Sequence, residues 1–344
     1  DRGAQLSYTG LTFSPDGSRI YLSNVNGDIK VFGVRANQQV FPLFSIPLPP
    51  ANAPGRKAEI PAGIAVSPDG NRLYVALNLS NRLIELDTTT GHVLRTWNVG
   101  VAPFDVVPAG QKIYVSNWGG RRPDANSVTG PAGRGTFVRV DPVRYIASEG
   151  SVSVIDLNTT NQTEILTGLH ACALALSPDD RYLVVANAGS DTLSVVDTHT
   201  DKIVDTLFAR QKPGDLFGAQ PNALAFDKSG RRLYVCNGTQ NAVAVFQFES
   251  KSRLLGLIPV HRFKPGKTKL LGLIPVGWFP GAIVDDASRD CLYVANIKDI
   301  SHGREGKSGA NREFNTKEYC GSLSLVPIPS ERELSMFTQM TLRN

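Results

Sequence analysis

The chain has 344 residues, of which 41% are hydrophobic and 19% are charged. This composition can build a large core, but no run approaches the ~20 apolar residues of a membrane-spanning helix, so a helical membrane protein is excluded. The formal net charge of +5 is local, because residues 251–269 hold six basic side chains and no acidic one. The rest of the chain has 30 basic and 31 acidic residues, which argues against a broad basic surface for nucleic acid.

A short motif recurs six times along the chain. An apolar strand ends in an aromatic or apolar residue, two or three small or apolar residues and an asparagine. The six copies lie at residues 21–24, 74–78, 114–117, 184–187, 234–237 and 293–296. The two clearest copies follow a Ser-Pro-Asp-Gly turn, at 14–17 and 67–70. Such a repeat is one small sheet that cannot bury its faces alone, so neighbouring repeats must stack.

The second repeat displays the strand pattern most clearly. Short apolar or alternating segments at 64–66, 72–76, 82–87 and 92–99 are separated by turn residues, which predicts four antiparallel strands. Four strands in a repeat of about 40 residues are typical of a β-propeller blade. The sequence therefore predicts an all-β propeller of four-stranded antiparallel blades, with the extra residues of longer repeats in loops.

The strand ends Tyr-Leu-Ser-Asn, Tyr-Val-Ser-Asn and Tyr-Val-Ala-Asn resemble the YVTN β-propeller family. Residues 221–226, 271–281 and 320–327 are similar to one bacterial branch of it, in which a secreted seven-bladed propeller precedes an alkaline-phosphatase-like phosphoesterase domain. The resemblance implies seven blades, export to a periplasm or cell surface, and a phosphoesterase domain as neighbour. No metal-binding phosphatase motif occurs in these residues, so we assign them no catalytic residue, no metal and no cofactor.

The two ends of the chain depart from the family pattern. We expect one propeller domain over residues 1–330 and a C-terminal helical tail or linker over 331–344, where Leu334, Phe337 and Met340 follow a helical spacing. Six repeats are visible where the family implies seven. We expect about one blade's worth of chain to precede Asp1; a six-bladed ring closed by irregular pairing is the alternative.

A near-duplication flanks the basic segment, because residues 252–260 recur as 268–276. One copy suffices as an outer strand, so the other is an extra edge strand or a protruding ribbon. The basic residues that we select here are Arg253, Arg262, Lys264, Lys267 and Lys269. We interpret the ribbon as a solvated loop or a contact for an acidic partner. Phe263 is its only aromatic residue for base stacking, so nucleic acid is not the expected partner.

Long loops collect on one predicted face of the propeller. In an up-and-down blade, the loop between strands two and three and the loop to the next blade emerge on the same face. Residues 118–149 and 297–319 belong to the first class, and residues 49–62 and 209–220 to the second. A scaffold crowned with long loops usually presents a binding surface there.

The loop at 118–149 is the richest in candidate binding residues. It begins at Trp118 and contains Arg121, Arg122, Arg134, Arg139 and Arg144. Arginines bind carboxylates or phosphates of a ligand, but these could instead pair with Asp124, Asp141 and Glu149 and hold the loop in shape. In the loop at 297–319, Lys298 and His302 are candidates for an interface.

Histidine and cysteine residues give few further signals. No histidine has a partner at a metal-ligand spacing; His170 precedes the predicted inner strand 171–176, and is either a ligand or acid–base residue at the channel mouth or a hydrogen-bonded residue at a blade end. Cys172, Cys236, Cys291 and Cys320 lack CxxC spacing, which argues against zinc. We expect four buried thiols without a disulfide, because Cys291 and Cys320 begin neighbouring antiparallel strands, whose starts lie apart.

These observations predict a non-catalytic, exported binding or assembly module that uses its long-loop face to bind a protein partner. The first alternative is an accessory propeller domain of a larger phosphoesterase. The second is a propeller enzyme, lactonase-like or a haem-binding oxidoreductase. It would require a cluster of His, Glu or Arg at the channel mouth.

Overall fold

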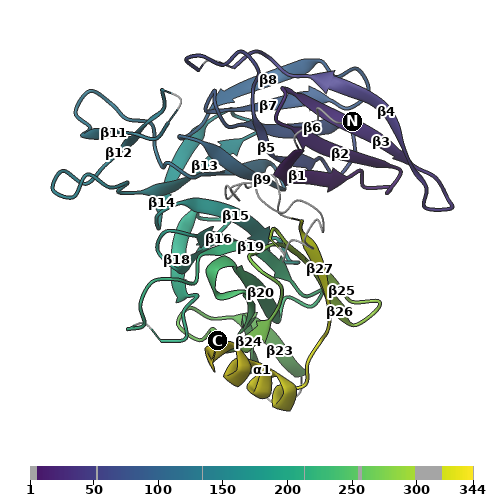
Figure 1. The fold of residues 1–344 in the computed structure, drawn as a ribbon, viewed down its shortest axis with the longest axis vertical. Helices are drawn as coiled ribbons and strands as arrows, with labels where there is room; N and C mark the ends of the chain where they lie inside the picture. Colours follow the sequence, from purple (N-terminus) through teal and green to yellow (C-terminus); the bar gives the residue numbers. More distant parts are fainter. Residues whose placement is uncertain are drawn as a thin grey trace, which may run out of the picture. The chain divides into compact units, whose positions relative to one another are not determined.

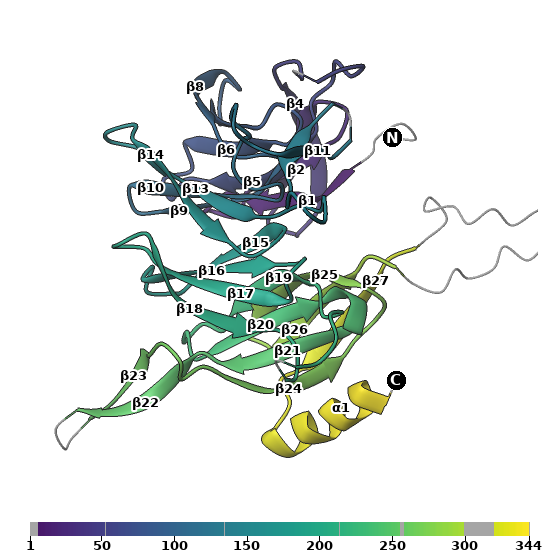
Figure 2. The ribbon, with the colours of Figure 1, turned by 90° about the vertical axis from the view of Figure 1, so that its left-hand side faces the viewer.

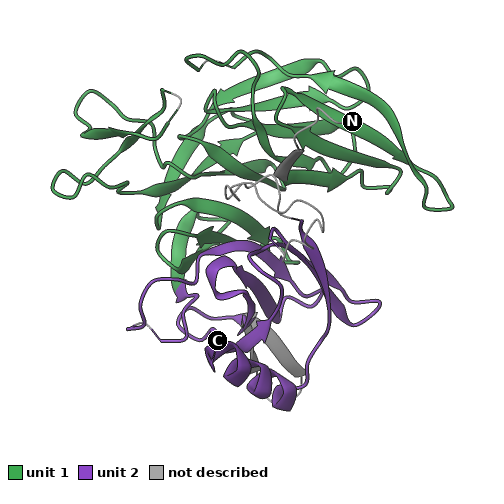
Figure 3. Cartoon of the chain, in the orientation of Figure 1, with its two compact units in different colours: residues 1–206 green, residues 207–344 purple. Residues whose placement is uncertain are grey.

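The structure is a computed structural model that describes residues 6–51, 53–133, 135–212, 214–254, 258–298 and 320–343. The chain divides into two compact units, Asp1–Thr206 and Leu207–Asn344, which are coloured separately in Figure 3. We call them unit 1 and unit 2. The described part of the chain has no helix that is long and apolar enough to cross a membrane.

Unit 1 contains the first four blades, each an antiparallel sheet of four strands (Figure 1). The first has β1 (Leu6–Phe13), β2 (Arg19–Asn24), β3 (Asp28–Val34) and β4 (Val40–Pro47). The second has β5 (Pro61–Val66), β6 (Arg72–Leu77), β7 (Arg82–Asp87) and β8 (Val93–Asn98). The third has β9 (Pro103–Ala109), β10 (Lys112–Asn117), β13 (Gly150–Asp156) and β14 (Gln162–Thr167). The fourth has β15 (Ala171–Leu176), β16 (Tyr182–Asn187), β17 (Thr192–Asp197) and β18 (Lys202–Phe208), whose end lies in unit 2.

Unit 2 contains the fifth and sixth blades (Figure 2). The fifth has β19 (Pro221–Phe226), β20 (Arg232–Asn237), β21 (Ala242–Gln247) and β24 (Lys269–Pro275). The sixth has β25 (Pro280–Asp286), β26 (Cys291–Asn296) and β27 (Ser322–Pro327). The described residues give the sixth blade three strands. The six repeats of the sequence thus correspond to six blades, five of which have the predicted four strands.

In the third, fourth and sixth blades, the asparagine at the end of the second strand ties that strand to the third. Its side-chain amide donates to the hydroxyls of two alternate residues on the third strand. The donor and acceptors are Asn117 with Ser151 and Ser153, Asn187 with Thr192 and Ser194, and Asn296 with Ser322 and Ser324. All of these Nδ2–Oγ distances are between 2.9 and 3.2 Å. In these three blades the repeat asparagine is therefore structural. In the first blade Asn24 donates to Asp28 at 2.6 Å, and in the fifth Asn237 donates to the Ala209 carbonyl at 3.0 Å.

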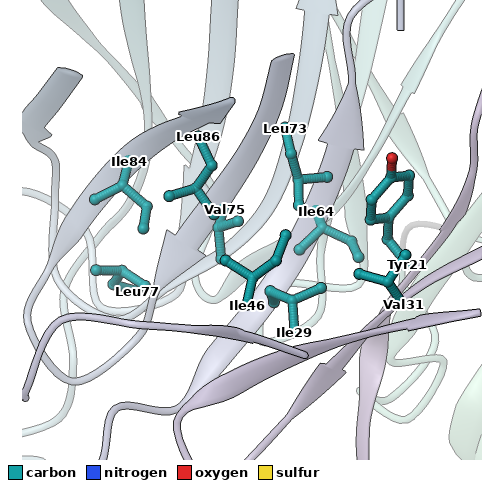
Figure 4. Packing of buried hydrophobic residues seen from close by; sticks show 10 residues of the cluster. All are labelled: Tyr21, Ile29, Val31, Ile46, Ile64, Leu73, Val75, Leu77, Ile84 and Leu86. Atoms are coloured by element: carbon teal, nitrogen blue, oxygen red, sulfur yellow. The ribbon is translucent and has the colours of Figure 1, made fainter. Parts of the chain in front are cut away.

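Successive blades pack through two different faces. We call the face that carries the second-strand tyrosine the outgoing face, and the opposite face the incoming face. Figure 4 shows the first such contact, in which Tyr21, Ile29 and Val31 of the first blade's outgoing face pack with Ile64, Leu73 and Val75 on the second blade's incoming face. Alternation along each strand produces both faces, because successive side chains point to opposite sides of a sheet.

The duplicated segment has two different structures. The second copy forms β24, the outer strand of the fifth blade, whereas the first copy lies in the two-stranded hairpin β22 (Glu249–Leu254) and β23 (Ile258–Phe263). This hairpin projects from unit 2 in Figure 2, so the protruding ribbon is the correct alternative. The predicted C-terminal helix is present as α1 (Glu331–Arg343). It packs on β24, where the Leu273 amide donates to the Thr338 hydroxyl at 2.9 Å.

The prediction of four buried thiols is only partly correct. None of the four cysteines forms a disulfide, and Cys172 and Cys236 are fully buried. Cys291 is half-buried and Cys320 is exposed. The prediction for Cys320 was wrong because it lies just before β27, the last strand of the three-stranded blade, where no further strand of the described chain covers it. The register places Cys291 opposite Pro327 and Asn296 opposite Ser322. Cys291 and Cys320 therefore lie at opposite ends of the pair of strands, as expected.

Candidate functional site

The long loop at 118–149 is an ordered element with its own small core. It contains a two-stranded hairpin, β11 (Thr129–Pro131) and β12 (Phe137–Arg139), that projects from the sheets of unit 1 in Figure 1. Val138 and Val140 are buried against Val101, which precedes the inner strand of the third blade. The loop is therefore anchored by apolar contacts as well as by charges.

The described arginines of this loop have partners within unit 1. Arg121 makes a bidentate contact with Glu149, with Nε–Oε1 and Nη2–Oε2 distances of 3.1 and 2.8 Å. Arg139 donates to Asp124 at 2.8 Å and lies 3.6 Å from Glu149. Asp124 has its pKa lowered to about 2, chiefly by the hydrogen bond from Arg139.

Two further arginines differ in what they contact. Arg122 donates to backbone carbonyls, including that of Val99 at 2.6 Å, and burial lowers its pKa. Arg144 is exposed and pairs with Asp141 three residues earlier, at 3.5 Å. Arg134 lies outside the described residues. The structure thus supplies the internal partners that the sequence offered, and the ligand-binding role of these arginines stays a prediction.

The same loop exposes apolar side chains. Val143 is 84% exposed and Tyr145 is 71% exposed. Val128, Phe137 and Ile146 are also exposed large hydrophobic residues. The turn that presents Val143 and Tyr145 is held by the Asp141 carboxylate, which accepts the Val143 and Arg144 amides at 3.0 and 2.8 Å. An ordered loop that exposes apolar side chains is a feature of protein interaction surfaces.

Two predicted site residues come together in a stack of rings. The Trp118 and His170 rings lie 4.7 Å apart with planes 8° from parallel, and Phe104 stacks on Trp118 at 5.7 Å. All three rings are half-buried. Burial lowers the pKa of His170, so the imidazole is neutral near pH 7. Gly189 leaves the space for it, because a Cβ there would lie 2.7 Å from the His170 Nδ1 atom.

His170 occupies a backbone position that recurs in four blades. Ala102, His170, Gln220 and Phe279 precede the inner strand of the third to sixth blades, and all four have left-handed φ values between 51° and 59°. In each case the carbonyl accepts the amide that follows the repeat asparagine, at 2.9–3.1 Å. The stacked position of His170 thus follows from a bend that is built into the repeat.

Asp105 is the most perturbed acid in the described part of unit 1. It follows Phe104 on the inner strand β9, and its two carboxylate oxygens accept the backbone amides of Val106 and Leu174, each at 2.9 Å. Desolvation raises its pKa to about 6, although these two hydrogen bonds oppose the shift. Asp105 therefore links neighbouring inner strands through its two carboxylate oxygens.

The candidates in unit 2 have different surroundings. The Lys298 ammonium lies 5.4 Å from the Trp278 ring centroid and 5.1 Å from that of Phe279, a cation–π arrangement. His302 lies outside the described residues. Lys264, Lys267 and Lys269 are exposed, whereas Arg253 and Arg262 are described only as backbone positions of β22 and β23. Phe263 is buried and stacks on Phe248 at 4.6 Å, so it does not offer a ring face to a base.

The sequence analysis missed Phe104 and Asp105. A signal was present, because Pro103 opens an inner strand in the same way that Ala171 does after His170. Aligning the inner strands of the blades would have placed Phe104 beside the end of β10, where Trp118 lies. The described residues contain no group of three or more His, Cys, Asp or Glu side chains that could hold a metal.

Comparisons with known proteins agree on the architecture. The model of the family described as "Lactonase, 7-bladed beta-propeller" matches residues 138–267, which is less than half of the chain. The β-propeller domain of Cps50 (Swd1) from Myceliophteria thermophila has a TM-score of 0.53 at 10% identity, over 85% of this chain and 81% of that one. The fold is a β-propeller. The family description names seven blades, and the described residues of this chain form six.

A second solved structure that matches the chain is hydrazine synthase from Kuenenia stuttgartiensis. It is 19% identical, with a TM-score of 0.47 over 83% of this chain and 92% of that chain. No curated protein matches the chain. Likeness at these identities concerns the fold alone.

Proposed function

We propose that this chain is a non-catalytic binding module, and that the loop at 118–149 is its binding surface for a protein partner. The observation that carries the proposal is the exposure of Val143 and Tyr145 on an ordered turn. Apolar side chains at the tip of an anchored loop lose little conformational freedom on binding, so more of their burial energy remains as affinity.

The charges of the loop support an apolar contact over an anionic ligand. Arg121 and Arg139 already contact Glu149 and Asp124, and Arg122 contacts backbone carbonyls. An incoming phosphate or carboxylate would compete with these bonds. The resemblance of the sequence to exported propellers favours a periplasmic or cell-surface partner, with a phosphoesterase domain as the leading identity.

The test compares three forms of the protein as baits in an extract of the native source. These are the unchanged chain, a V143S/Y145S variant and a K264S/K267S variant, which alters an exposed surface of the other unit. The proposal expects proteins that bind the unchanged chain and the lysine variant but are lost from V143S/Y145S by tenfold or more. Equal recovery on all three baits would refute a role for the loop, and selective loss on the lysine variant would relocate binding to unit 2.

A propeller enzyme is a second candidate, favoured by the match to the lactonase family model. In unit 1 it would use the neutral imidazole of His170, with Asp105 as the acid whose pKa is raised to about 6. Hydrolysis of a panel of γ- and δ-lactones by the purified chain tests it. Turnover that H170Q abolishes would favour the enzyme, whereas rates equal to buffer alone are expected for a binding module.

A further inference from the structure

Four asparagines of the sequence are followed, two residues later, by a serine or threonine, with a residue other than proline between them. They are Asn78, Asn158, Asn161 and Asn237. This pattern is the acceptor for N-linked glycans, which occur on surface loops of exported proteins. Attachment requires the asparagine amide and the following hydroxyl to be accessible together. The structure divides the four asparagines into two that the fold uses and two that it leaves exposed.

Asn78 and Asn237 are used by the fold. The Asn78 side-chain amide donates to a backbone carbonyl at 3.2 Å, and the fully buried Asn237 amide donates to another at 3.0 Å. The hydroxyls of Ser80 and Thr239, two residues later, are also hydrogen-bond donors within the protein. Neither asparagine can accept a glycan without breaking these contacts.

Asn158 and Asn161 lie on the turn between β13 and β14, and both are exposed. They are held through their backbone amides, which donate to the Asp156 carboxylate at 2.9 Å and to the Thr159 hydroxyl at 3.3 Å. The residue between Asn161 and its threonine, Gln162, already belongs to β14 and donates to a backbone carbonyl at 2.6 Å. Asn158 is therefore the more accessible of the two acceptors.

The turn itself does not require an asparagine at position 158. The same turn follows the third strand of the second and fourth blades, where an aspartate carboxylate also accepts the amides two and three residues later. The residue that matches Asn158 is Thr89 in the second blade and His199 in the fourth. Since threonine and histidine form the same turn, its geometry does not account for Asn158.

Thr160, which supplies the hydroxyl for Asn158, has a backbone conformation that is unfavourable for threonine. Its φ is 62°, in the left-handed region, and the residues that match it are Gly91 with φ 72° and Asp201 with φ 54°. Glycine and aspartate are common at such positions, whereas a β-branched residue is an outlier there for steric reasons. Thr160 is also exposed, so packing does not explain it. An unfavourable residue on an exposed turn points to a role outside the fold.

We propose that Asn158 is a site of N-linked glycosylation in the exported protein. The donor is a lipid-linked oligosaccharide diphosphate. A bond forms between the Asn158 Nδ2 atom and C1 of the first sugar, and the C1–O bond to the diphosphate breaks. The diphosphate leaves with the bonding electron pair, and the amide nitrogen loses one proton to a base of the transferase. The inference depends on export, which the resemblance to exported propellers favours, and not on binding by the loop at 118–149.

A glycan on Asn158 is compatible with binding by that loop. The loop ends where β13 begins, at Gly150, and the turn follows the last residue of β13, Asp156. A strand rises about 3.3 Å per residue, so the two ends of β13 lie roughly 20 Å apart. The glycan is thus attached at the end of the third blade that is opposite to the loop.

The test is peptide mass spectrometry of the protein purified from its native source, without prior removal of glycans. The proposal expects the peptide that contains Asn158 to carry the additional mass of a glycan on most copies, with sugar fragment ions. Peptides that contain Asn78 and Asn237 are expected to be unmodified and serve as internal controls. An unmodified Asn158, or a glycan on another of the four asparagines in its place, would overturn the proposal.

Two variants at Thr160, produced in the same source, separate the acceptor from the turn. T160S retains the hydroxyl, and the glycan on Asn158 is expected to remain. T160G removes the hydroxyl, and it should fold because glycine readily adopts the left-handed conformation, which circular dichroism checks. The glycan is expected to be lost from folded T160G. A glycan that persists on Asn158 of this variant would contradict the proposed acceptor.

Discussion

Val243 in the fifth blade and Leu323 in the sixth occupy the same place in the repeat, two residues into the third strand. Val243 is buried by the next sheet of unit 2, and Leu323 has more than half of its surface in water. The strands themselves are alike in length and register. The comparison teaches that a local pattern determines which face of a strand is apolar, while the neighbouring blade determines whether that face is buried.

The largest expected effect is the difference in stability loss between replacing a buried leucine and replacing an exposed one. Leu193→Ala removes a fully buried side chain from the fourth blade and should lower the unfolding free energy by about 2–5 kcal/mol, because it leaves a cavity. Leu323→Ala should cost about 0.5 kcal/mol or less, as at other exposed positions. Urea unfolding followed by tryptophan fluorescence measures both. Equal losses would mean that Leu323 is covered even in this chain.

The next prediction tests whether the sixth blade is ordered although Leu323 and Leu325 are exposed on its outgoing face. Asn187 and Asn296 are both buried and each donates to two hydroxyls. Changing either to alanine should cost about 1–3 kcal/mol, because buried or half-buried hydroxyl groups lose their partner. The same urea experiment measures both variants. A much smaller loss for Asn296→Ala would mean that the sixth blade depends on a neighbouring sheet for its order.

A third pair compares covered and exposed charges in the loop at 118–149. Arg121→Ala removes a bidentate partner from Glu149, whose side chain is only 13% exposed, and should cost about 1–2 kcal/mol. Arg144→Ala, at an exposed pair, should cost at most about 0.5 kcal/mol. Limited proteolysis is the measurement, with faster cleavage within the loop expected for Arg121→Ala alone. Identical cleavage rates would show that apolar contacts are enough to anchor it.

The smallest effect is a pH dependence of opposite sign for two aspartates. The folded pKa of Asp105 is raised from 3.8 to about 6 by desolvation, so its contribution to stability is full below about pH 4 and is lost as the pH rises through 6. The pKa of Asp16 is lowered to about 2, mainly by the Ser14 hydroxyl, so its contribution is present above about pH 4 and is lost as the pH falls towards 2.

Urea midpoints measured from pH 2 to pH 7 test this pair. Asp105→Asn should remove the decline between pH 4 and 6 and leave the acid limb unchanged. Asp16→Asn should leave that decline and make the acid limb shallower, because Asp69, Asp124 and Asp286 also have their pKa lowered to about 2. Unchanged profiles in both variants would mean that other carboxylates dominate both limbs.

The sequence predicted the repeat, the strands of the second blade, the terminal helix and the long loop at 118–149, whereas most of the predicted loop at 297–319 lies outside the described residues. Each of these depends on local patterns: alternation, turn residues and the asparagine whose hydroxyl partners lie two residues apart on the next strand. The prediction failed where neighbouring strands determine whether a residue is buried. Cys320 was expected to be buried like Cys236, but it adjoins an edge strand. The hairpin β11–β12 was not predicted, because its strands have three residues each and little alternation.

The candidate site was predictable in part. Trp118 and His170 were selected separately, and the structure adds their stacking and the third ring of Phe104. Distances between side chains of different blades depend on how the sheets pack, which no single segment encodes. For the same reason, the sequence showed which acidic residues could pair with the arginines, but it did not decide between these internal ion pairs and a bound ligand.

The left-handed residue before each inner strand is occupied by alanine, histidine, glutamine and phenylalanine in four successive blades. Its backbone is fixed by a carbonyl hydrogen bond that does not involve the side chain. Each side chain at this position still needs its own space, as Gly189 provides for His170 and Gly238 for Phe279. Side chains here can therefore differ from blade to blade while the hydrogen bond that fixes the bend is kept.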